Sequence, residues 1–359
     1  MKIAIIGLSN SGKTTVFNAL TGKNIETTLY PTTSGEPHRG IVKVPDSRID
    51  KLSAMFSPKK TTYATVEYID YIGMTKGDME QNRKVFDLIK DADAVVQAVR
   101  FFSDDAVVHP MEHVAPMRDV ETIELELIFG DLDLAEKRLE RMEQGAKRGK
   151  KPNEAEKRLL LKCKDHLEKE TALRDVQFTD EEKLAMRPLQ FLSTKPEVVV
   201  LNVGEKDLNT DHINNLQSTL QTRFPALSII TLCGKIEMEI AQLSEGEKEP
   251  FLEELGIDEP ASNKLIHTSY AILGLVSFFT VGDDEVKAWT IKQDSSALSA
   301  AGKIHSDIER GFIRAEVISI DDFISAGTMQ TAKERGLLRL EGKTYMVKDG
   351  DIINFRFNV

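Results

Sequence analysis

The chain has 359 residues, of which 41% are hydrophobic and 29% charged, and its formal net charge is −11 at pH 7. This length exceeds the size at which one hydrophobic core stops growing, so we expect two or three domains. The acidic balance argues against a protein that coats nucleic acid through bulk charge, although it is compatible with a local basic patch.

Nothing in the sequence indicates a membrane or secreted protein. No apolar run reaches the length of a membrane span, and the N-terminal residues read as a strand rather than a secretory signal. The two cysteines, Cys163 and Cys233, lie far apart and outside any metal-binding spacing, as is typical of a reducing compartment. We expect a cytoplasmic monomer with no membrane partner and no DNA specificity.

The first twenty residues predict a strand, a phosphate-binding loop and a helix. After the apolar run Ile3 to Ile6, the segment GLSNSGKT at positions 7–14 has the Walker A spacing. In this pattern backbone N–H groups surround phosphate oxygens, the lysine neutralises phosphate charge and the threonine hydroxyl ligates magnesium. The helix that follows directs its positive end at the same anion. The predicted phosphate ligands are Asn10, Ser11, Gly12, Lys13, Thr14 and Thr15, and Thr14 is also a predicted magnesium ligand.

The loop YPTTSGEP at positions 30–37 has the place of a first switch region. A threonine hydroxyl or backbone group there would meet magnesium and the γ-phosphate, and either Thr32 or Thr33 fits, with Thr33 as our candidate metal ligand. For each threonine taken alone, a hydroxyl that caps its own turn is an equally good interpretation.

The strand-like run Thr65–Ile69 ends at Asp70, and Gly73 completes a DxxG pattern. A carboxylate at such a strand end holds magnesium through water, and the glycine amide reaches the γ-phosphate. The next residue is Met74, where Ras-like proteins have the glutamine that orients the attacking water. A thioether cannot do this, so we assign no catalytic residue. Either another group positions the water or intrinsic hydrolysis is slow.

Three further apolar runs, Ala92–Val99, Glu197–Leu201 and Leu227–Thr231, predict buried strands of a doubly wound parallel sheet. The carboxyl ends of such strands are where a nucleotide base is read. The sequence NVGE at positions 202–205 stands where guanine-specific proteins have NKxD. The extra methylene of the glutamate spoils the bidentate contact with guanine, which favours ATP, with GTP as the weaker alternative. The predicted base-binding residues are Asn202, Val203, Glu205 and Gly234.

The sequence between the central strands predicts a helical hairpin. Leucine and methionine recur at helical spacing from position 121 to position 167, interrupted at Gly145–Pro152. The interruption carries four basic residues, Lys147, Arg148, Lys150 and Lys151. They form either a probe for a phosphate backbone or a solvated turn without a partner.

From about Val276 the pattern changes to that of a compact α+β module. We expect strands near 277–281, 286–291, 315–320, 343–347 and 352–357, with a helix over 297–309. No nucleophile, base and orienting group share a suitable spacing in this part, so the module predicts binding rather than chemistry.

Several stretches resemble the YchF/Ola family of Obg-related P-loop NTPases. They are GLSNSGKTTVFNALTG, YPTTSGEP, YIDYIGMTKG, NVGEKD and, most specifically, the terminal blocks that begin at DEVKAWTIKQDSS and LRLEGKTYMV. The resemblance implies a doubly wound, mainly parallel α/β nucleotide-binding domain (1–120 plus 193–275), an inserted helical coiled coil (121–192) and a C-terminal TGS domain (276–359). It also implies a preference for ATP associated with the NxxE motif, a hydrophobic residue in place of the catalytic glutamine, and a link to ribosomes and translation under stress.

The chain departs from this family after the DxxG pattern. Typical members continue with a sequence like KGAHxGxGLGN, whereas this chain reads KGDMEQN at positions 76–82. Met79 thus stands in the place of a histidine that is a proposed contributor to hydrolysis in the family, and that role does not transfer. We expect a shorter, stiffer second switch and hydrolysis that is slow or dependent on a partner.

The leading hypothesis is therefore a magnesium-dependent, ATP-hydrolysing conformational switch that works with the ribosome or ribosomal RNA. One alternative is a nucleotide-regulated ribosome- or RNA-binding protein with negligible intrinsic hydrolysis, and another is a GTP-preferring GTPase. A metabolic kinase is a third alternative, against which the terminal block argues.

Overall fold

The computed structural model describes residues 1–27, 35–151, 153–208 and 210–358. The chain forms two compact units, the first made of Met1–Val42 and Glu67–Leu265 and the second of Lys43–Val66 and Ile266–Val359. The predicted nucleotide-binding domain includes residues 43–66, which in the structure group with the C-terminal unit. The division into three functional domains stays a prediction.

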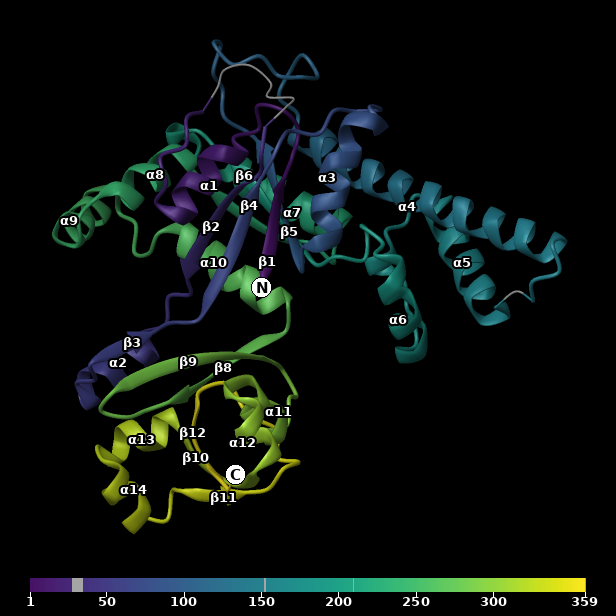
Figure 1. Cartoon of the computed structure of the whole chain (residues 1–359). Helices are drawn as coiled ribbons and strands as arrows, with labels where there is room; N and C mark the ends of the chain where they lie inside the picture. The colour runs from purple at the N-terminus through teal and green to yellow at the C-terminus, as the bar shows by residue number, and fades with distance from the viewer. Residues whose placement is uncertain (28–34, 152, 209, 359) are drawn as a thin grey trace. The chain divides into compact units, whose positions relative to one another are not determined.

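A six-stranded sheet with the order β2-β4-β1-β5-β6-β7 lies at the centre of the first unit (Figure 1). Its strands are β1 (Lys2–Ile6), β2 (His38–Lys43), β4 (Thr65–Asp70), β5 (Ala94–Arg100), β6 (Glu197–Asn202) and β7 (Ser228–Leu232). The pairs β1–β4, β1–β5, β5–β6 and β6–β7 are parallel. Every residue of β5 and β6 is buried, as expected of parallel strands covered on both faces. The predicted doubly wound, mainly parallel sheet is confirmed.

Helices pack on this sheet in two hydrophobic clusters. The helices of the unit are α1 (Lys13–Thr21), α3 (Met79–Asp91), α4 (Pro116–Lys147), α5 (Glu154–Leu167), α6 (Asp180–Met186), α7 (Asp211–Arg223), α8 (Gly234–Gln242) and α9 (Glu245–Leu255), with short 3₁₀ turns at Leu173–Asp175, Arg187–Leu189 and Glu205–Asp207. One cluster joins α3 and α4 to β1, β4 and β5. The other joins α7 and α8 to β6 and β7. Helix α10 (Ala261–Ile272) leads into the second unit.

Helices α4 and α5 form the predicted hairpin (Figure 1). Leu159, Leu160 and Cys163 of α5 are buried with Ile128 and Ala135 of α4 in one cluster. The chain turns between the helices through Gly149, whose φ of +84° lies in the left-handed region that favours glycine. The predicted leucine and methionine spacing therefore marks the contact face of two real helices.

The second unit contains another six-stranded sheet, with the order β11-β10-β12-β8-β9-β3. Its strands are β3 (Lys60–Thr62), β8 (Leu275–Thr280), β9 (Glu285–Lys292), β10 (Phe312–Ser319), β11 (Arg339–Glu341) and β12 (Asp351–Phe357). Its helices are α2 (Ser47–Phe56), α11 (Ala297–Ile304), α12 (Ser306–Arg310), α13 (Ile320–Ala326) and α14 (Met329–Glu334). The predicted α+β module is confirmed.

Two details of the predicted module are wrong. Residues 343–347 do not form a strand: Met346 makes only an isolated bridge to Ser296, and the edge strand is β11. The backbone of this segment instead bonds to residues around the start of α11, where Val347 N donates to Ser295 O and Ala297 N donates to Tyr345 O. The helix expected over 297–309 divides at His305, which caps the second piece. No helix within the described residues is long and apolar enough to cross a membrane.

Candidate nucleotide-binding site

The loop between β1 and α1 has the backbone shape of a phosphate cradle. Gly12 has a φ of +87°, and a Cβ added there would lie 2.1 Å from Asn202 Nδ2, so both conformation and space demand glycine. Within the described residues no side chain caps the N-terminus of α1, and its first turn carries no acidic residue. The positive end of the helix is therefore left for an anion.

Lys13 places a buried ammonium group at this loop. Its side chain Nζ donates to Leu8 O at 3.0 Å, and the residue is only 7% exposed. Burial lowers the pKa of Lys13, while the negative charge of Asp70 acts in the opposite direction. An ammonium group that has lost much of its hydration gains more from a phosphate than one in water does.

Thr14 and Asp70 supply the oxygen atoms of a candidate magnesium site. Thr14 Oγ1 donates to Asp70 Oδ2 at 2.8 Å. The other carboxylate oxygen, Oδ1, is buried and makes no hydrogen bond of normal geometry with the described residues. Burial raises the pKa of Asp70, opposed by the charge of Lys13 and the hydrogen bond from Thr14. Hydroxyl and carboxylate oxygens are ligands that magnesium prefers, so these residues fit the ion.

A magnesium ion here would depend on the nucleotide for further ligands. Among the described residues, no three His, Cys, Asp or Glu side chains gather where they could hold a metal. This agrees with P-loop sites, in which phosphate oxygens and water complete the magnesium shell. The predicted ligand Thr33 and its neighbour Thr32 lie outside the described residues, so their roles stay predictions.

Gly73 lies against the phosphate loop. A Cβ at this position would come within 2.6 Å of Ser9 Cα, so only glycine allows the approach. The next residue, Met74, donates its backbone N–H to Gly7 O at 2.9 Å. Gly73 is thus held beside the loop to which the phosphates are predicted to bind.

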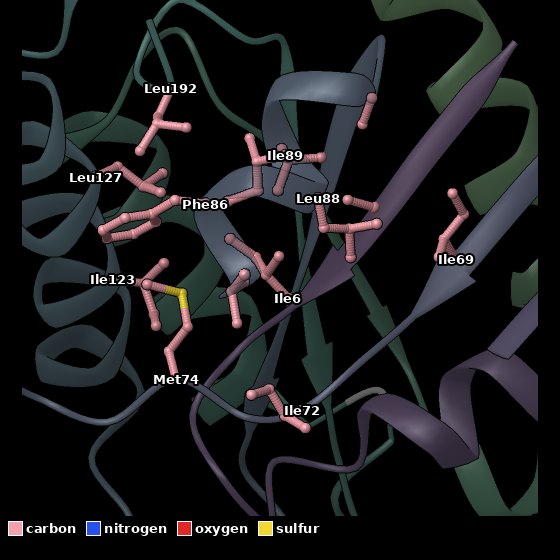
Figure 2. Close-up of a cluster of buried hydrophobic side chains, with 14 of the residues drawn as sticks. Ile6, Ile69, Ile72, Met74, Phe86, Leu88, Ile89, Ile123, Leu127 and Leu192 are labelled. Carbon is pink, nitrogen blue, oxygen red and sulfur yellow. The ribbon is translucent and has the colours of Figure 1, made fainter. Parts of the chain in front are cut away.

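Met74 turns its side chain away from solvent. It is 0% exposed and belongs to the cluster that contains Ile123 and Leu127 of α4. Figure 2 shows the sulfur directed toward Ile123. Residue 74 therefore cannot orient a water molecule for attack, which agrees with the sequence prediction and explains it by packing.

Asn202 connects the phosphate loop to the predicted base-binding loop. Its Nδ2 donates to Ser11 O at 3.2 Å, and its Oδ1 accepts from Gly234 N at 3.0 Å. The residue is 4% exposed. Val203, also a predicted base contact, is 2% exposed and part of the core, so only its backbone is left to meet a base.

Glu205 begins the short 3₁₀ turn that follows β6 and is paired with a lysine. Lys235 Nζ donates to Glu205 Oε1 at 3.0 Å, and this hydrogen bond raises the pKa of Lys235. The side chains are 69% and 53% exposed, for Lys235 and Glu205 respectively. Sequence reasoning missed Lys235, whose signal was its place beside Gly234 in the first turn of α8.

Two family models and several known proteins match this chain. Residues 2–129 match a model described as 50S ribosome-binding GTPase, and residues 275–358 match the C-terminal YchF-GTPase model, described as a protein of unknown function. A Bacillus subtilis (strain 168) protein named ribosome-binding ATPase YchF is 44% identical over 361 residues, which cover 99% of this chain and 98% of the relative. The Escherichia coli O157:H7 protein of the same name is 40% identical over 362 residues, with 100% and 99% covered.

A solved structure agrees with the sequence relatives. The Schizosaccharomyces pombe YchF GTPase superimposes with a TM-score of 0.84 at 26% identity, covering 99% of this chain and 97% of that one. The chain therefore belongs to the YchF family of Obg-related P-loop NTPases.

Proposed function

We propose that this protein is an ATP-binding, ATP-hydrolysing conformational switch that acts with the ribosome. The observation that carries the proposal is the gathering of Lys13, Thr14 and Asp70, all at least half-buried by their neighbours, at one glycine-rich loop. A glycine turn that binds nothing does not require a buried ammonium group and a buried carboxylate at a helix N-terminus, because burial of charged groups is costly. A nucleotide polyphosphate with magnesium supplies the charges that this arrangement lacks.

In this proposal the loop residues Asn10 to Thr15 bind the phosphates and Lys13 neutralises their charge. Thr14 and Asp70 hold magnesium, with Thr33 as a further candidate ligand, and Gly73 donates its N–H to the γ-phosphate. Magnesium, when bound, supplies charge neutralisation on the phosphate oxygens. The protein's own part is to fix the positions of the phosphates and to exclude water from around Lys13.

ATP is the proposed nucleotide because of the residue at position 205. Aspartate at this place in guanine-specific proteins accepts two hydrogen bonds from guanine, and the longer Glu205 changes that geometry. The hydrogen bond from Lys235 further occupies one of its oxygens. The names of the bacterial relatives, ribosome-binding ATPase, point in the same direction.

The ribosome is the proposed partner on the strength of those names and of the basic hairpin tip. Lys147, Arg148, Lys150 and Lys151 are exposed where α4 and α5 meet. Lysine and arginine clustered on an otherwise acidic protein give a local site for a phosphate backbone. We retain the division into nucleotide-binding (1–120 plus 193–275), helical (121–192) and C-terminal (276–359) domains as part of the proposal, along with a monomeric, cytoplasmic protein.

A second candidate function is a nucleotide-regulated ribosome-binding protein with negligible turnover. It is favoured by Met74, whose buried side chain leaves no water-orienting group at that position, and by Met79 in place of the family histidine. Single-turnover hydrolysis with and without ribosomes separates the two candidates, because measurable turnover of the isolated protein contradicts the second.

Equilibrium nucleotide binding tests the site assignment. We expect the wild-type protein to bind Mg·ATP more tightly than Mg·GTP and Lys13→Ala to lose most of the affinity for both. Lys84→Ala, an exposed lysine on α3, is the matched control and should bind like wild type. Tighter binding of GTP would refute the base assignment, and full binding by Lys13→Ala would refute the phosphate site.

A further inference from the structure

The segment that follows Gly73 is held by three side chains from outside the phosphate loop, which we call the switch latch: Gln81, Asn82 and Glu126. Gln81 lies in the first turn of α3, where Asp78 caps the helix by accepting from Gln81 N at 2.9 Å. Gln81 Nε2 donates to Gly73 O at 3.1 Å and to Thr75 Oγ1 at 3.1 Å. Gln81 therefore grips the carbonyl of the glycine predicted to sense the γ-phosphate.

Asn82 binds the backbone of Thr75 through both the N–H and the carbonyl group of that residue. Its Oδ1 accepts from Thr75 N at 3.0 Å and its Nδ2 donates to Thr75 O at 2.8 Å, so the carboxamide pairs with the backbone of Thr75 as a neighbouring strand would. The residue is 0% exposed. A buried carboxamide with both ends satisfied holds one orientation, because any rotation leaves polar groups unpaired.

Glu126 connects this segment to helix α4. Its Oε2 accepts from Asn82 Nδ2 at 2.9 Å, and its Oε1 accepts from Gly77 N at 2.7 Å. The carboxylate is buried, with the residue 5% exposed, and hydrogen bonds to a charged acceptor are stronger than neutral ones. Both oxygens of one residue of α4 are thus engaged with the segment that begins at Gly73.

Apolar packing also joins the segment after Gly73 to helix α4. Met74 lies in the cluster with Ile123 and Leu127 of α4 (Figure 2). On α4, Glu126 lies three positions after Ile123 and directly before Leu127, so these three residues are close neighbours on the helix. Helix α4 is also the first arm of the hairpin. The position of Gly73 is therefore tied by hydrogen bonds and by packing to the helix that carries the basic tip.

We propose that the switch latch positions Gly73 for the γ-phosphate and couples occupancy of that phosphate to α4. Glu126 is a positioning residue that acts through Asn82 and Thr75, and Gln81 acts directly on the Gly73 carbonyl. A nucleoside diphosphate has no group at Gly73, so the latch affects triphosphate binding alone. This inference rests on the proposed nucleotide-binding function.

A latch that only stabilised the fold would behave differently from one that positions Gly73. Loss of a structural contact lowers the thermal stability. It also lowers the apparent affinity for both nucleotides by the same factor, because a smaller fraction of the protein is folded. Loss of a positioning contact lowers the ratio of triphosphate to diphosphate affinity in protein that is still folded. The ratio is therefore the measurement that distinguishes the two roles.

Glu126→Gln is the variant that tests this most cleanly. A carboxamide offers one acceptor oxygen to two donors, so either Gly77 N or Asn82 Nδ2 faces an NH₂ group. With Mg²⁺ present, we expect affinity for the β,γ-imido analogue of ATP to fall about tenfold and affinity for ADP to stay within about twofold. Glu143→Gln, the same chemical change at an exposed position of α4, should bind both nucleotides like wild type.

A second variant and a second measurement guard against an unfolded protein. Gln81→Ala truncates a half-buried side chain and should lower the triphosphate affinity in the same selective way. Hydrogen exchange of the amides from position 73 to 78, in the presence of the ATP analogue, should be faster in both variants. An unchanged affinity ratio in the two folded variants, or an equal loss for both nucleotides, overturns the latch. Failure of the wild-type protein to bind either nucleotide instead overturns the proposed function.

Discussion

Thr14 donates a hydrogen bond to Asp70, with 2.8 Å between Oγ1 and Oδ2, although the two residues are 56 positions apart in the chain. They meet because β1 and β4 are parallel neighbours in register, Ile5 opposite Asp70, so both strands end at the same edge of the sheet. The parallel pairing of β1 and β4 therefore brings a hydroxyl and a carboxylate, both oxygen groups that suit magnesium, next to the phosphate loop.

Asp70→Asn should make nucleotide binding less dependent on magnesium. The change removes the negative charge that would hold the ion while keeping the size of the side chain. We expect affinity for ATP in Mg²⁺ to fall at least about tenfold, since a charged carboxylate holds the ion and its bound water more strongly than a neutral amide does. In EDTA the affinity should equal or exceed that of wild type, because a carboxylate no longer repels the phosphates. The exposed Asp87→Asn is the control, and an equal loss with and without Mg²⁺ would count against Asp70 as a magnesium ligand.

Asn202→Ala should lower both the affinity for every nucleotide and the free energy of unfolding. The truncation leaves Ser11 O and Gly234 N without their buried partner, which costs about 1–3 kcal/mol of unfolding free energy. Because Asn202 supports the loop rather than the terminal phosphate, ATP and ADP should lose affinity by the same factor. Urea denaturation and equilibrium titration measure the two effects. Asn214→Ala on the exposed face of α7 should change neither, and a selective loss of ATP affinity would contradict this role for Asn202.

Glu205→Asp should move the nucleotide preference toward guanine. Shortening the side chain restores the carboxylate position of guanine-specific proteins, so we expect the ratio of GTP to ATP affinity to rise about tenfold, the effect of one hydrogen bond of about 1.4 kcal/mol. Competition between the two nucleotides on one protein sample gives the ratio directly. Lys235→Ala removes the partner without shortening Glu205, and it should change the ratio less. A ratio unmoved by Glu205→Asp would show that selectivity lies elsewhere.

The buried Asp131 should give the stability a measurable pH dependence. It accepts hydrogen bonds from Leu192 N, Ser193 N and Ser193 Oγ, at 2.6, 2.8 and 2.6 Å. Burial raises the pKa of Asp131 to about 6 despite these bonds. Between about pH 6 and pH 4 this carboxyl group is therefore largely protonated in the folded protein but ionised in the unfolded chain. The contribution of this group to the free energy of unfolding thus rises by about 1 kcal/mol from pH 7 to pH 5.

Comparison of wild type with Asp131→Asn isolates that contribution. The variant cannot take up the proton, whereas every other titrating group is common to both proteins. The difference in unfolding free energy between wild type and variant, measured by urea denaturation, should be larger at pH 5 than at pH 7 by about 1 kcal/mol. A difference independent of pH would show that the pKa of Asp131 is not raised in the folded protein.

The sheet, the phosphate loop and the hairpin were predictable because their signals are local. The Walker A spacing fixes a loop between one strand and one helix, and the apolar runs of β5 and β6 indicate strands buried on both faces. The helical spacing of leucines in α4 and α5 similarly predicts the faces through which the two helices pack together. Each of these features needs information only from neighbouring residues.

The rest depends on contacts between residues far apart in the chain, which no local pattern reports. Strand β3 pairs with β9 across more than two hundred residues, Lys60 opposite Glu285, so residues 43–66 could not be assigned to the second unit in advance. Asn82 and Glu126 have the polarity of ordinary solvent-facing helix residues. Only the packing of α3 beside α4 shows that both are buried and engaged with the second switch.

The central claim is that the wild-type protein hydrolyses ATP at the phosphate loop. Single-turnover release of phosphate from Mg·ATP, followed for wild type and Lys13→Ala with and without added ribosomes, tests it most directly. We predict slow release by the isolated wild-type protein, faster release with ribosomes and none above background for Lys13→Ala. Release that persists in Lys13→Ala, or release from GTP alone, would contradict the account.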